Sequence, residues 1–230
     1  MLLCEYKFRD SVFSFSVEEE EFILHGNSVR ILHAAAIDEL FDRLLQLPED
    51  HPDVRDERIP YWAEVWPSAI AMAEFLLQHK VLIAGKSVLE IGCGLGLPGI
   101  VAGKLAASVM LSDYLPDAVQ LAAHNWQLNH NTTALTAEID WRTADTSLAA
   151  QVLLASDVAY ERRMFEPLLQ AFRQLTLPGG KIIVSEPDRH FARDFFKTLS
   201  KSQFDVETHR MKITRKGIVS NVNIHVLNGV

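Results

Sequence analysis

The residues best suited to chemistry stand in the segment VLEIGCGLGLPGI, Val88 to Ile100. An apolar run that enters a glycine cluster and leaves it as a second apolar run predicts a strand, a sharp turn and a helix. Glycine permits a positive φ and a close approach of the backbone to a ligand. The N–H groups at the start of the following helix add positive potential. This segment is therefore the first candidate ligand site, with tight packing of the turn as the alternative.

The spacing of the glycines separates the possible ligands. The dinucleotide pattern G-x-G-x-x-G, begun at Gly92, needs a third glycine where the chain has Leu97. A phosphate loop would end in Gly-Lys-Ser or Gly-Lys-Thr, and LPGI supplies neither the lysine nor the hydroxyl. The observed pattern is E-x-G-x-G-x-G, from Glu90 to Gly96. S-Adenosylmethionine carries no phosphate, and the carboxylate of Glu90 would favour its ammonium and sulfonium by charge.

A second candidate follows the glycine turn by about 20 residues, the distance at which a sugar-binding acid is expected. The stretch LSDY places Asp113 at the carboxyl end of the next predicted strand. A carboxylate there can accept hydrogen bonds from both ribose hydroxyls of an adenosine ligand. Asp113 fits NAD and S-adenosylmethionine equally well, so it supports nucleoside binding without choosing between the two.

The elements that must position these residues alternate between strand and helix from Pro67 onward. Such alternation predicts an α/β fold with a doubly wound, mostly parallel sheet and helices on both faces. The last two β runs have no helix between them and surround TRKG, which predicts a C-terminal antiparallel hairpin. Seven strands are expected, at 86–92, 108–113, 134–140, 151–157, 180–186, 203–213 and 220–228. Helices are expected at 67–79, 98–107, 116–129, 164–175 and 191–200.

The N-terminal part, residues 1–58, reads as a small α+β cap on a main domain of residues 59–230. Strands are expected at 11–17 and 22–26, and a helix with apolar residues at helical spacing at 37–47. Between the strands, the acidic run Glu18 to Glu21 is interpreted as a solvated edge. The polar segment 48–60, twice interrupted by proline, is expected to be a loop.

Composition excludes several classes of protein. The formal charge of −8 disfavours a protein whose main task is to bind nucleic acid. The two cysteines, Cys4 and Cys93, argue against a disulfide framework, and together with the lack of a signal-like start they predict a cytoplasmic protein. No apolar run approaches the roughly 20 residues of a membrane span. The scattered histidines do not predict a metal site. The oligomeric state has no signal in the sequence.

With the glycine pattern, Asp113 and the terminal hairpin together, the chain resembles the seven-β-strand S-adenosylmethionine-dependent methyltransferases, from about Tyr61 to its end. YWAEVWPSA before the first core strand, IDW after the third and SDVAY after the fourth narrow the resemblance. They are similar to the methyltransferase-like group that includes many protein-lysine methyltransferases. The nearest likeness is to bacterial members related to nicotinamide N-methyltransferase-like and electron-transfer-flavoprotein lysine methyltransferases.

The resemblance implies a role for each matching residue. Trp66 would cover the methionine end of the cofactor, where an aromatic face attracts a sulfonium; wedging the cap onto the sheet is the alternative. Asp113 would hold the ribose. Asp157 and Tyr160 match an Asp-x-x-Tyr motif that is expected beside the nucleophile. The remaining cofactor contacts would be the backbone of the glycine turn, the adenine-packing tryptophan and a pocket serine, which are Gly92, Cys93, Gly94, Gly96, Trp141 and Ser156.

The residues after the fourth predicted strand bear on the methyl acceptor. The motif Asp157-Val158-Ala159-Tyr160 lacks the prolines that shape a slot for planar amides or bases, and acids at the predicted strand ends suit a cation. These acids are Asp157, Glu161, Glu186 and Asp188, although solvated loop carboxylates are an equal interpretation. A protein lysine is the first hypothesis, a small amine or pyridine-like acceptor the second, and a non-catalytic S-adenosylmethionine-binding module the third. Arg142 departs from the glycine that lysine enzymes often show at its position.

Overall fold

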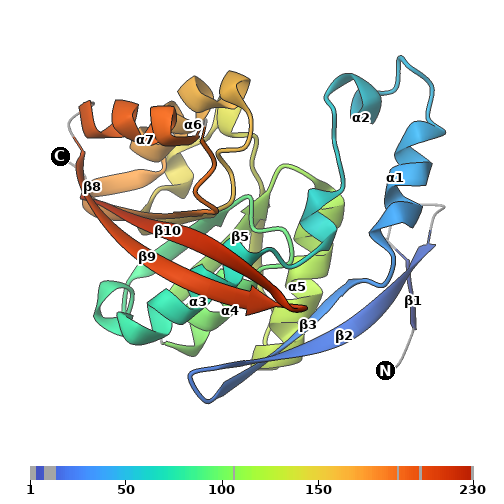
Figure 1. The fold of residues 1–230 in the computed structure, drawn as a ribbon, viewed down its shortest axis with the longest axis horizontal. Coiled ribbons are helices and arrows are strands. Elements are labelled where there is room, and N and C mark those ends of the chain that lie inside the picture. Colours follow the sequence, from blue (N-terminus) through green and yellow to red (C-terminus); the bar gives the residue numbers. More distant parts are fainter. Residues whose placement is uncertain (1–3, 8–13, 106, 191, 202–203, 229–230) are drawn as a thin grey trace.

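A seven-stranded sheet forms the centre of the computed structural model, which describes residues 4–7, 14–105, 107–190, 192–201 and 204–228 (Figure 1). The strand order is β6-β5-β4-β7-β8-β10-β9. Neighbours pair in parallel from β6 to β8, whereas β10 runs antiparallel to both β8 and β9. The predicted doubly wound sheet with its C-terminal hairpin is confirmed. The strands are β4 (Ser87–Ile91), β5 (Ser108–Asp113), β6 (Leu135–Glu138), β7 (Ala150–Ser156), β8 (Thr176–Glu186), β9 (Asp205–Arg215) and β10 (Ile218–Asn228).

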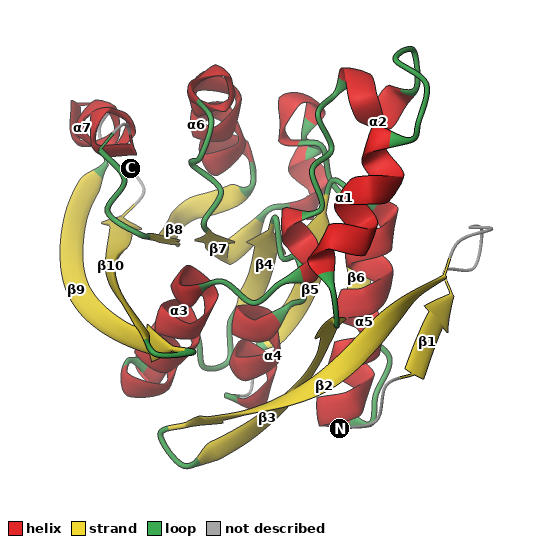
Figure 2. Cartoon of the chain, turned by 45° about the vertical axis from the view of Figure 1, so that its right-hand side comes forward, coloured by secondary structure: helices red, strands yellow, loops and turns green. Residues whose placement is uncertain are grey.

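Helices cover both faces of this sheet, as Figure 2 shows. Side chains alternate along each strand, so Val88 of β4 joins the apolar cluster with α3, α4 and α5, and Leu89 joins the cluster with α6 and α7. A proline stands in the first turn of each helix on the first face, where its missing N–H costs no hydrogen bond. The helices are α3 (Pro67–Gln78), α4 (Leu97–Lys104), α5 (Pro116–His130), α6 (Phe165–Gln174) and α7 (Ala192–Lys201). None of those in the described ranges is long and apolar enough to cross a membrane.

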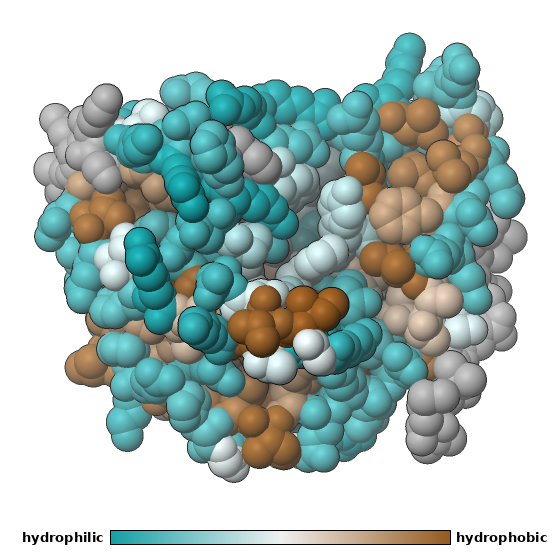
Figure 3. All heavy atoms as spheres, viewed as in Figure 1, coloured by the Kyte–Doolittle hydropathy of each residue, from teal (hydrophilic) through white to brown (hydrophobic). Residues whose placement is uncertain are grey.

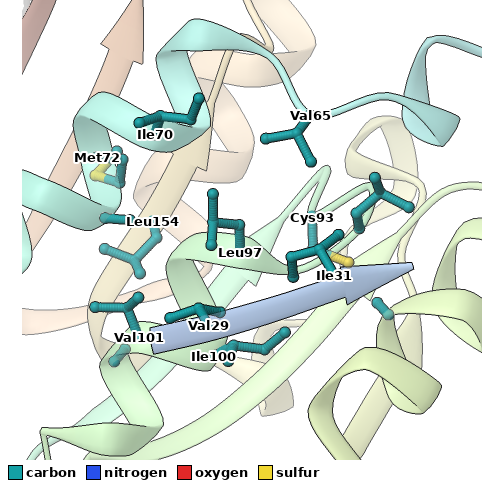
Figure 4. Packing of buried hydrophobic residues seen from close by; sticks show 14 of the residues in the cluster. Val29, Ile31, Val65, Ile70, Met72, Cys93, Leu97, Ile100, Val101 and Leu154 are labelled. Atoms are coloured by element: carbon teal, nitrogen blue, oxygen red, sulfur yellow. The ribbon is translucent and has the colours of Figure 1, made fainter. Parts of the chain in front are cut away.

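The N-terminal part forms a separate antiparallel sheet of β1 (Cys4–Lys7), β2 (Ser14–Leu24) and β3 (Asn27–Ala34), followed by α1 (Ile37–Leu45). Val29 and Ile31 of β3 point toward Leu97 and Ile100 of α4 in Figure 4. All four side chains belong to one buried apolar cluster. The N-terminal sheet therefore packs directly on the core of the main domain.

Two expectations for the N-terminal part were wrong: a separate strand at 22–26 and a loop throughout 48–60. Residues 22–24 continue β2 rather than starting a new strand, so the acidic run lies within one long strand that pairs with β3 along one side. The strand β3 had no counterpart in the sequence prediction. The polar segment 48–60 contains a short helix, α2 (Pro52–Arg55), whose first turn is capped by His51. Residues 11–13 of the first predicted strand are not described.

Asn125 of α5 joins the N-terminal sheet to the glycine turn. Its fully buried side chain accepts from Leu32 N–H at 2.8 Å and donates to the carbonyls of Leu32 and Leu95, both at 3.1 Å. Asn125→Ala is expected to lower the free energy of unfolding by about 2–4 kcal/mol, because it leaves buried backbone groups unpaired. Urea unfolding measures this loss. Asn129→Ala, which removes the analogous but exposed pairing with Arg30, is the control and should cost far less.

Candidate active site

A cavity of about 710 Å³ opens at the carboxyl ends of β4, β5 and β7. These strands meet where the strand order reverses, which is the usual ligand site of an open α/β sheet. Figure 3 shows the hollowed face between the α6–α7 side of the molecule and the N-terminal cap. The structure brings nearly all the predicted site residues to its wall, namely Trp66, Gly92, Cys93, Gly94, Gly96, Asp113, Trp141, Ser156, Asp157 and Tyr160.

The glycine turn forms one end of the cavity, and its backbone requires glycine. Gly92, Gly94 and Gly96 have φ of 59°, 51° and 81°, in the left-handed region that other residues avoid. A Cβ on Gly92 would lie 2.9 Å from a Val158 methyl and 3.3 Å from the Trp141 ring. The turn therefore presents bare backbone to the cavity, with an aromatic face beside it.

Asp113 links this turn to the end of β5. Its carboxylate accepts from Gly94 N–H at 2.9 Å and from Leu115 N–H at 3.1 Å. Burial raises the pKa of Asp113 above its ordinary value, and these backbone N–H groups oppose the rise. Burial likewise raises the pKa of the neighbouring Cys93 thiol, so this sulfur is neutral at physiological pH. The carboxylate keeps lone pairs for ligand hydroxyls at the position expected for a sugar.

Glu90 lies outside the cavity wall. It points to the same sheet face as Val88, toward α4, because alternate residues of β4 share a face. Its Oε2 accepts from Gly99 N–H at 2.9 Å in the first turn of α4, and its Oε1 has no hydrogen-bond partner among the described residues. The structure thus places this carboxyl behind the turn, as a partner of a helix start, rather than beside ligand charges.

The burial of Glu90 predicts a pH effect on stability. Desolvation raises its pKa from 4.5 to about 8. Between these two pH values the folded state holds a proton that the unfolded state releases. The contribution of protonated Glu90 to the free energy of unfolding is therefore fully present below about pH 4.5 and is lost as the pH rises to about 8. Glu90→Gln should be more stable than the wild type at pH 8, on the order of 2–4 kcal/mol, and equal to it near pH 4. Urea unfolding across this pH range measures the difference; identical pH slopes for both proteins would contradict it.

Asp157 lines the cavity directly after β7, beside the glycine turn, because β7 is the neighbour of β4 and Val158 lies against Gly92. Its φ of 57° and the bond from its N–H to Ser185 O, at 2.8 Å, turn the chain sharply there. The carboxylate is 9% exposed, forms an ion pair with Arg189, and accepts from Ser68 Oγ at 3.4 Å. Burial raises the pKa of Asp157 and Arg189 lowers it. A nearly buried carboxylate thus faces the cavity with one cation already on it.

Three aromatic rings of the cavity wall, those of Tyr61, Trp66 and Tyr160, form one cluster around Tyr61. The Tyr61 ring lies 5.9 Å from Trp66, 6.0 Å from Tyr160 and 6.2 Å from Phe41 of α1, each in an edge-on arrangement. Trp66 Nε1 donates to Tyr61 O at 2.7 Å and so fixes the indole. Partial burial raises the pKa of Tyr160 to about 12, so its hydroxyl stays protonated. Aromatic faces next to a carboxylate suit a cationic side chain.

The segment 56–59, here called the strap, is joined by ion pairs to two other parts of the chain. Arg142 donates to Asp56 at 2.8 Å and 3.1 Å, and Arg163 pairs with Glu57 at 2.6 Å. The hydrogen bonds from Arg142 hold the pKa of Asp56 well below its usual range. The strap lines the cavity. In the sequence, Arg142 stood out only because lysine enzymes often have glycine at its position. Its pairing with Asp56 could not be predicted, because the two residues are 86 positions apart.

The predicted set of acids does not converge on one point. Asp157 and Glu161 line the cavity, but Glu186 and Asp188 do not. Glu186 instead accepts from Asn223 at 2.7 Å, and Asp188 pairs with Arg193 at 3.1 Å. Among the residues that the structure describes, no group of three or more His, Cys, Asp or Glu could hold a metal ion.

Comparison with curated proteins finds several methyltransferases. Histone-arginine methyltransferase METTL23 of Rattus norvegicus is 37% identical over 59% of this chain and 65% of its own length. Protein N-lysine methyltransferase METTL21A of Danio rerio is 30% identical over 66% of this chain and 72% of that protein. The electron transfer flavoprotein beta subunit lysine methyltransferase of Danio rerio is 27% identical over 78% of this chain and 69% of that protein. Matches to METTL23 from four animals span 52–65% of those proteins.

Solved structures share the fold at low identity. Magnesium protoporphyrin IX methyltransferase of Synechocystis PCC 6803, solved with bound SAM, has a TM-score of 0.58 at 17% identity, covering 85% of this chain and 92% of that one. A putative RNA methyltransferase of Pyrococcus horikoshii has a TM-score of 0.56 at 19% identity, covering 84% and 96%. The model of the lysine methyltransferase family matches residues 56–202, which is more than half of the 230 residues. The chain therefore belongs to the lysine methyltransferase family.

Proposed function

We propose that this protein is an S-adenosylmethionine-dependent N-methyltransferase that acts on a protein lysine side chain. The observation that carries the proposal is the cavity itself. Its wall combines a bare glycine turn, the Asp113 carboxylate at the end of β5, and the Asp157 carboxylate after β7 with the rings of Tyr61, Trp66 and Tyr160. The family membership supports the same reaction class.

The residues present fit the cofactor. A volume of about 710 Å³ lies in the range of cavities that enclose a nucleoside-sized ligand. The turn has no side chain at its glycines, which leaves its backbone accessible to a ligand, and the Asp113 carboxylate in the cavity wall would accept from ribose hydroxyls. When bound, S-adenosylmethionine supplies a methyl group on a sulfonium, which is already activated for displacement. The residues that would hold it are Trp66, Gly92, Cys93, Gly94, Gly96, Asp113, Trp141 and Ser156.

The chain's own part in the reaction is alignment and electrostatics. A lysine ammonium has no lone pair, so it must release a proton before it can attack, and a poorly hydrated site lowers the pKa of an amine. Transfer of a methyl group to the neutral amine creates a cation, which the Asp157 carboxylate would stabilise as it forms. The ring of Tyr61, which lies against both Trp66 and Tyr160, would hold the side chain in line. Tyr160, protonated at neutral pH, would donate or accept one hydrogen bond.

Arginine is a second candidate acceptor, and one structural observation favours it. Asp157 already binds a guanidinium, that of Arg189, in the cavity wall. The METTL23 relatives, which are named histone-arginine methyltransferases, are 31–37% identical to this chain over half or more of its length. The sequence alone supports three further proposals. One is a small amine or pyridine-like acceptor, with the kinship to nicotinamide N-methyltransferase that it implies. The others are a bacterial source and a cytoplasmic location.

The test is incubation of the purified protein and methyl-labelled S-adenosylmethionine with a cell lysate. The proposal expects label on a discrete polypeptide band, and acid hydrolysis of that band should release methyl-lysine. Release of methyl-arginine instead would show that the methyl acceptor is arginine, the second candidate. Label found only in the small-molecule fraction would remove a protein substrate. Cofactor binding without any transfer, in lysates from several sources, would favour the non-catalytic module.

A further inference from the structure

Arg189 lines the cavity, and the proposed reaction gives its side chain no role. It belongs to the loop between β8 and α7, and its guanidinium forms an ion pair with Asp157. Its backbone N–H donates to Glu186 Oε2 at 3.0 Å, and Glu186 is itself held by Asn223 at 2.7 Å. The backbone of Arg189 is thus fixed, whereas its side chain is 30% exposed and reaches across the cavity wall.

The carboxylate of Asp157 has little room for a second partner. One oxygen binds Arg189 and the other accepts from Ser68 at 3.4 Å, a weak bond. The side chain is only 9% exposed, so water does not solvate it freely. Leaving such a carboxylate without a counter-charge is costly. An incoming group that displaces Arg189 must therefore bring a positive charge of its own.

We propose that Arg189 is a resident cation that occupies the acceptor position on Asp157, and that the side chain to be methylated enters by displacing it. The inference rests on the proposed function and concerns the same site. Free lysine side chains are charged at neutral pH, so the exchange replaces one cation by another and keeps Asp157 paired. The displaced guanidinium moves to the exposed side of its loop. The bound ammonium would release its proton to solvent, and the nitrogen would then form the N–C bond to the methyl group. The electron pair of the broken S–C bond would stay on the sulfur, and the resulting methylammonium would again be the counter-charge of Asp157.

This exchange gives the site a selectivity that the cavity shape alone does not provide. A neutral pyridine-like acceptor cannot replace the guanidinium without leaving Asp157 unpaired, so Arg189 disfavours it. A cationic lysine or arginine side chain replaces it without that cost. Arg189 is accordingly a specificity-determining residue, and it lowers the apparent affinity of every acceptor by competing for Asp157.

The experiment measures KM for the acceptor protein in the full-length chain. Arg189→Ala should lower this KM about tenfold, the equivalent of roughly one charged hydrogen bond. Arg189→Lys retains a competing cation and should stay near the wild-type value. Arg193→Ala is the matched control, because this neighbouring arginine pairs with Asp188 outside the cavity, at 3.1 Å. An unchanged or higher KM for Arg189→Ala would overturn the inference, as would an equal fall for Arg193→Ala.

A second measurement separates this inference from the proposed function. n-Butylammonium is titrated into wild-type protein and into Arg189→Ala, both saturated with S-adenosylhomocysteine, and its Kd is read by ligand-observed NMR. Tighter binding to the variant by about tenfold supports the exchange even if no polypeptide is ever methylated. Equal or weaker binding to the variant overturns it, even if the wild type proves to be a lysine methyltransferase.

Discussion

Asp157→Asn is expected to reduce kcat for methyl transfer by about a hundredfold to a thousandfold while leaving the Kd for the cofactor unchanged. The amide keeps the shape of the side chain but cannot stabilise the cation that forms on the acceptor nitrogen. Asparagine also tolerates the left-handed backbone, with φ of 57°, at this position. The variant should therefore fold like the wild type. Initial rates with labelled cofactor, together with S-adenosylhomocysteine titration, measure both quantities.

The control for Asp157→Asn is Asp188→Asn. Asp188 also has a left-handed φ, of 50°, but its carboxylate pairs with Arg193 and does not line the cavity. It should retain the wild-type rate. A full rate for Asp157→Asn with a normal cofactor affinity would show that the carboxylate after β7 has no part in the reaction.

Gly92→Ala is expected to raise the Kd for S-adenosylhomocysteine by about tenfold or more. The added Cβ would lie 2.9 Å from Val158 and 3.3 Å from the Trp141 ring, so the turn, the ring or both must move away from the ligand. The left-handed backbone adds a cost of about 1–2 kcal/mol to folding. Fluorescence titration of purified variant and wild type measures the affinity.

Gly85→Ala provides the matched control for this loss of affinity. Gly85 has a φ of 71°, like the glycines of the turn, but nothing lies within 4 Å of its would-be Cβ, and it is remote from the cavity wall. It should carry the same backbone cost of about 1–2 kcal/mol, without the clash, and show no change in Kd. Equal affinities for the two variants would mean that the glycine turn does not hold the ligand.

The core of the fold could be predicted because its signals are local. The strand β4, the glycine turn and the helix α4 follow one another directly in the sequence, from Ser87 to Lys104. The N-terminal sheet was less predictable. β3 lies in the run SVRILHAAA, which suits a strand or a helix, and its burial against α4 and α5 decides between them. The acidic run can lie within the strand β2 because its four glutamate side chains are exposed or half-buried, so their carboxylates stay in contact with water.

The site could be predicted as far as it follows strand ends. Asp113 and Asp157 each stand at or directly after a parallel strand, so sheet geometry brings them to one edge. The side-chain partners could not be predicted. Arg189 reaches Asp157 from 32 residues away, and Arg142 meets the strap from 86 residues away. Glu90 was predicted to face the ligand, but it does not line the cavity. Alternation along β4 turns its side chain toward α4, and the glycine motif alone does not give this direction.

The central claim is that the cavity at the ends of β4, β5 and β7 is built for a nucleoside thioether. Isothermal titration calorimetry of the purified chain with S-adenosylhomocysteine tests it without reference to any acceptor. We expect binding of one molecule per chain, and no heat with NAD under the same conditions. Saturable binding of NAD, combined with no response to S-adenosylhomocysteine or S-adenosylmethionine, would contradict the claim.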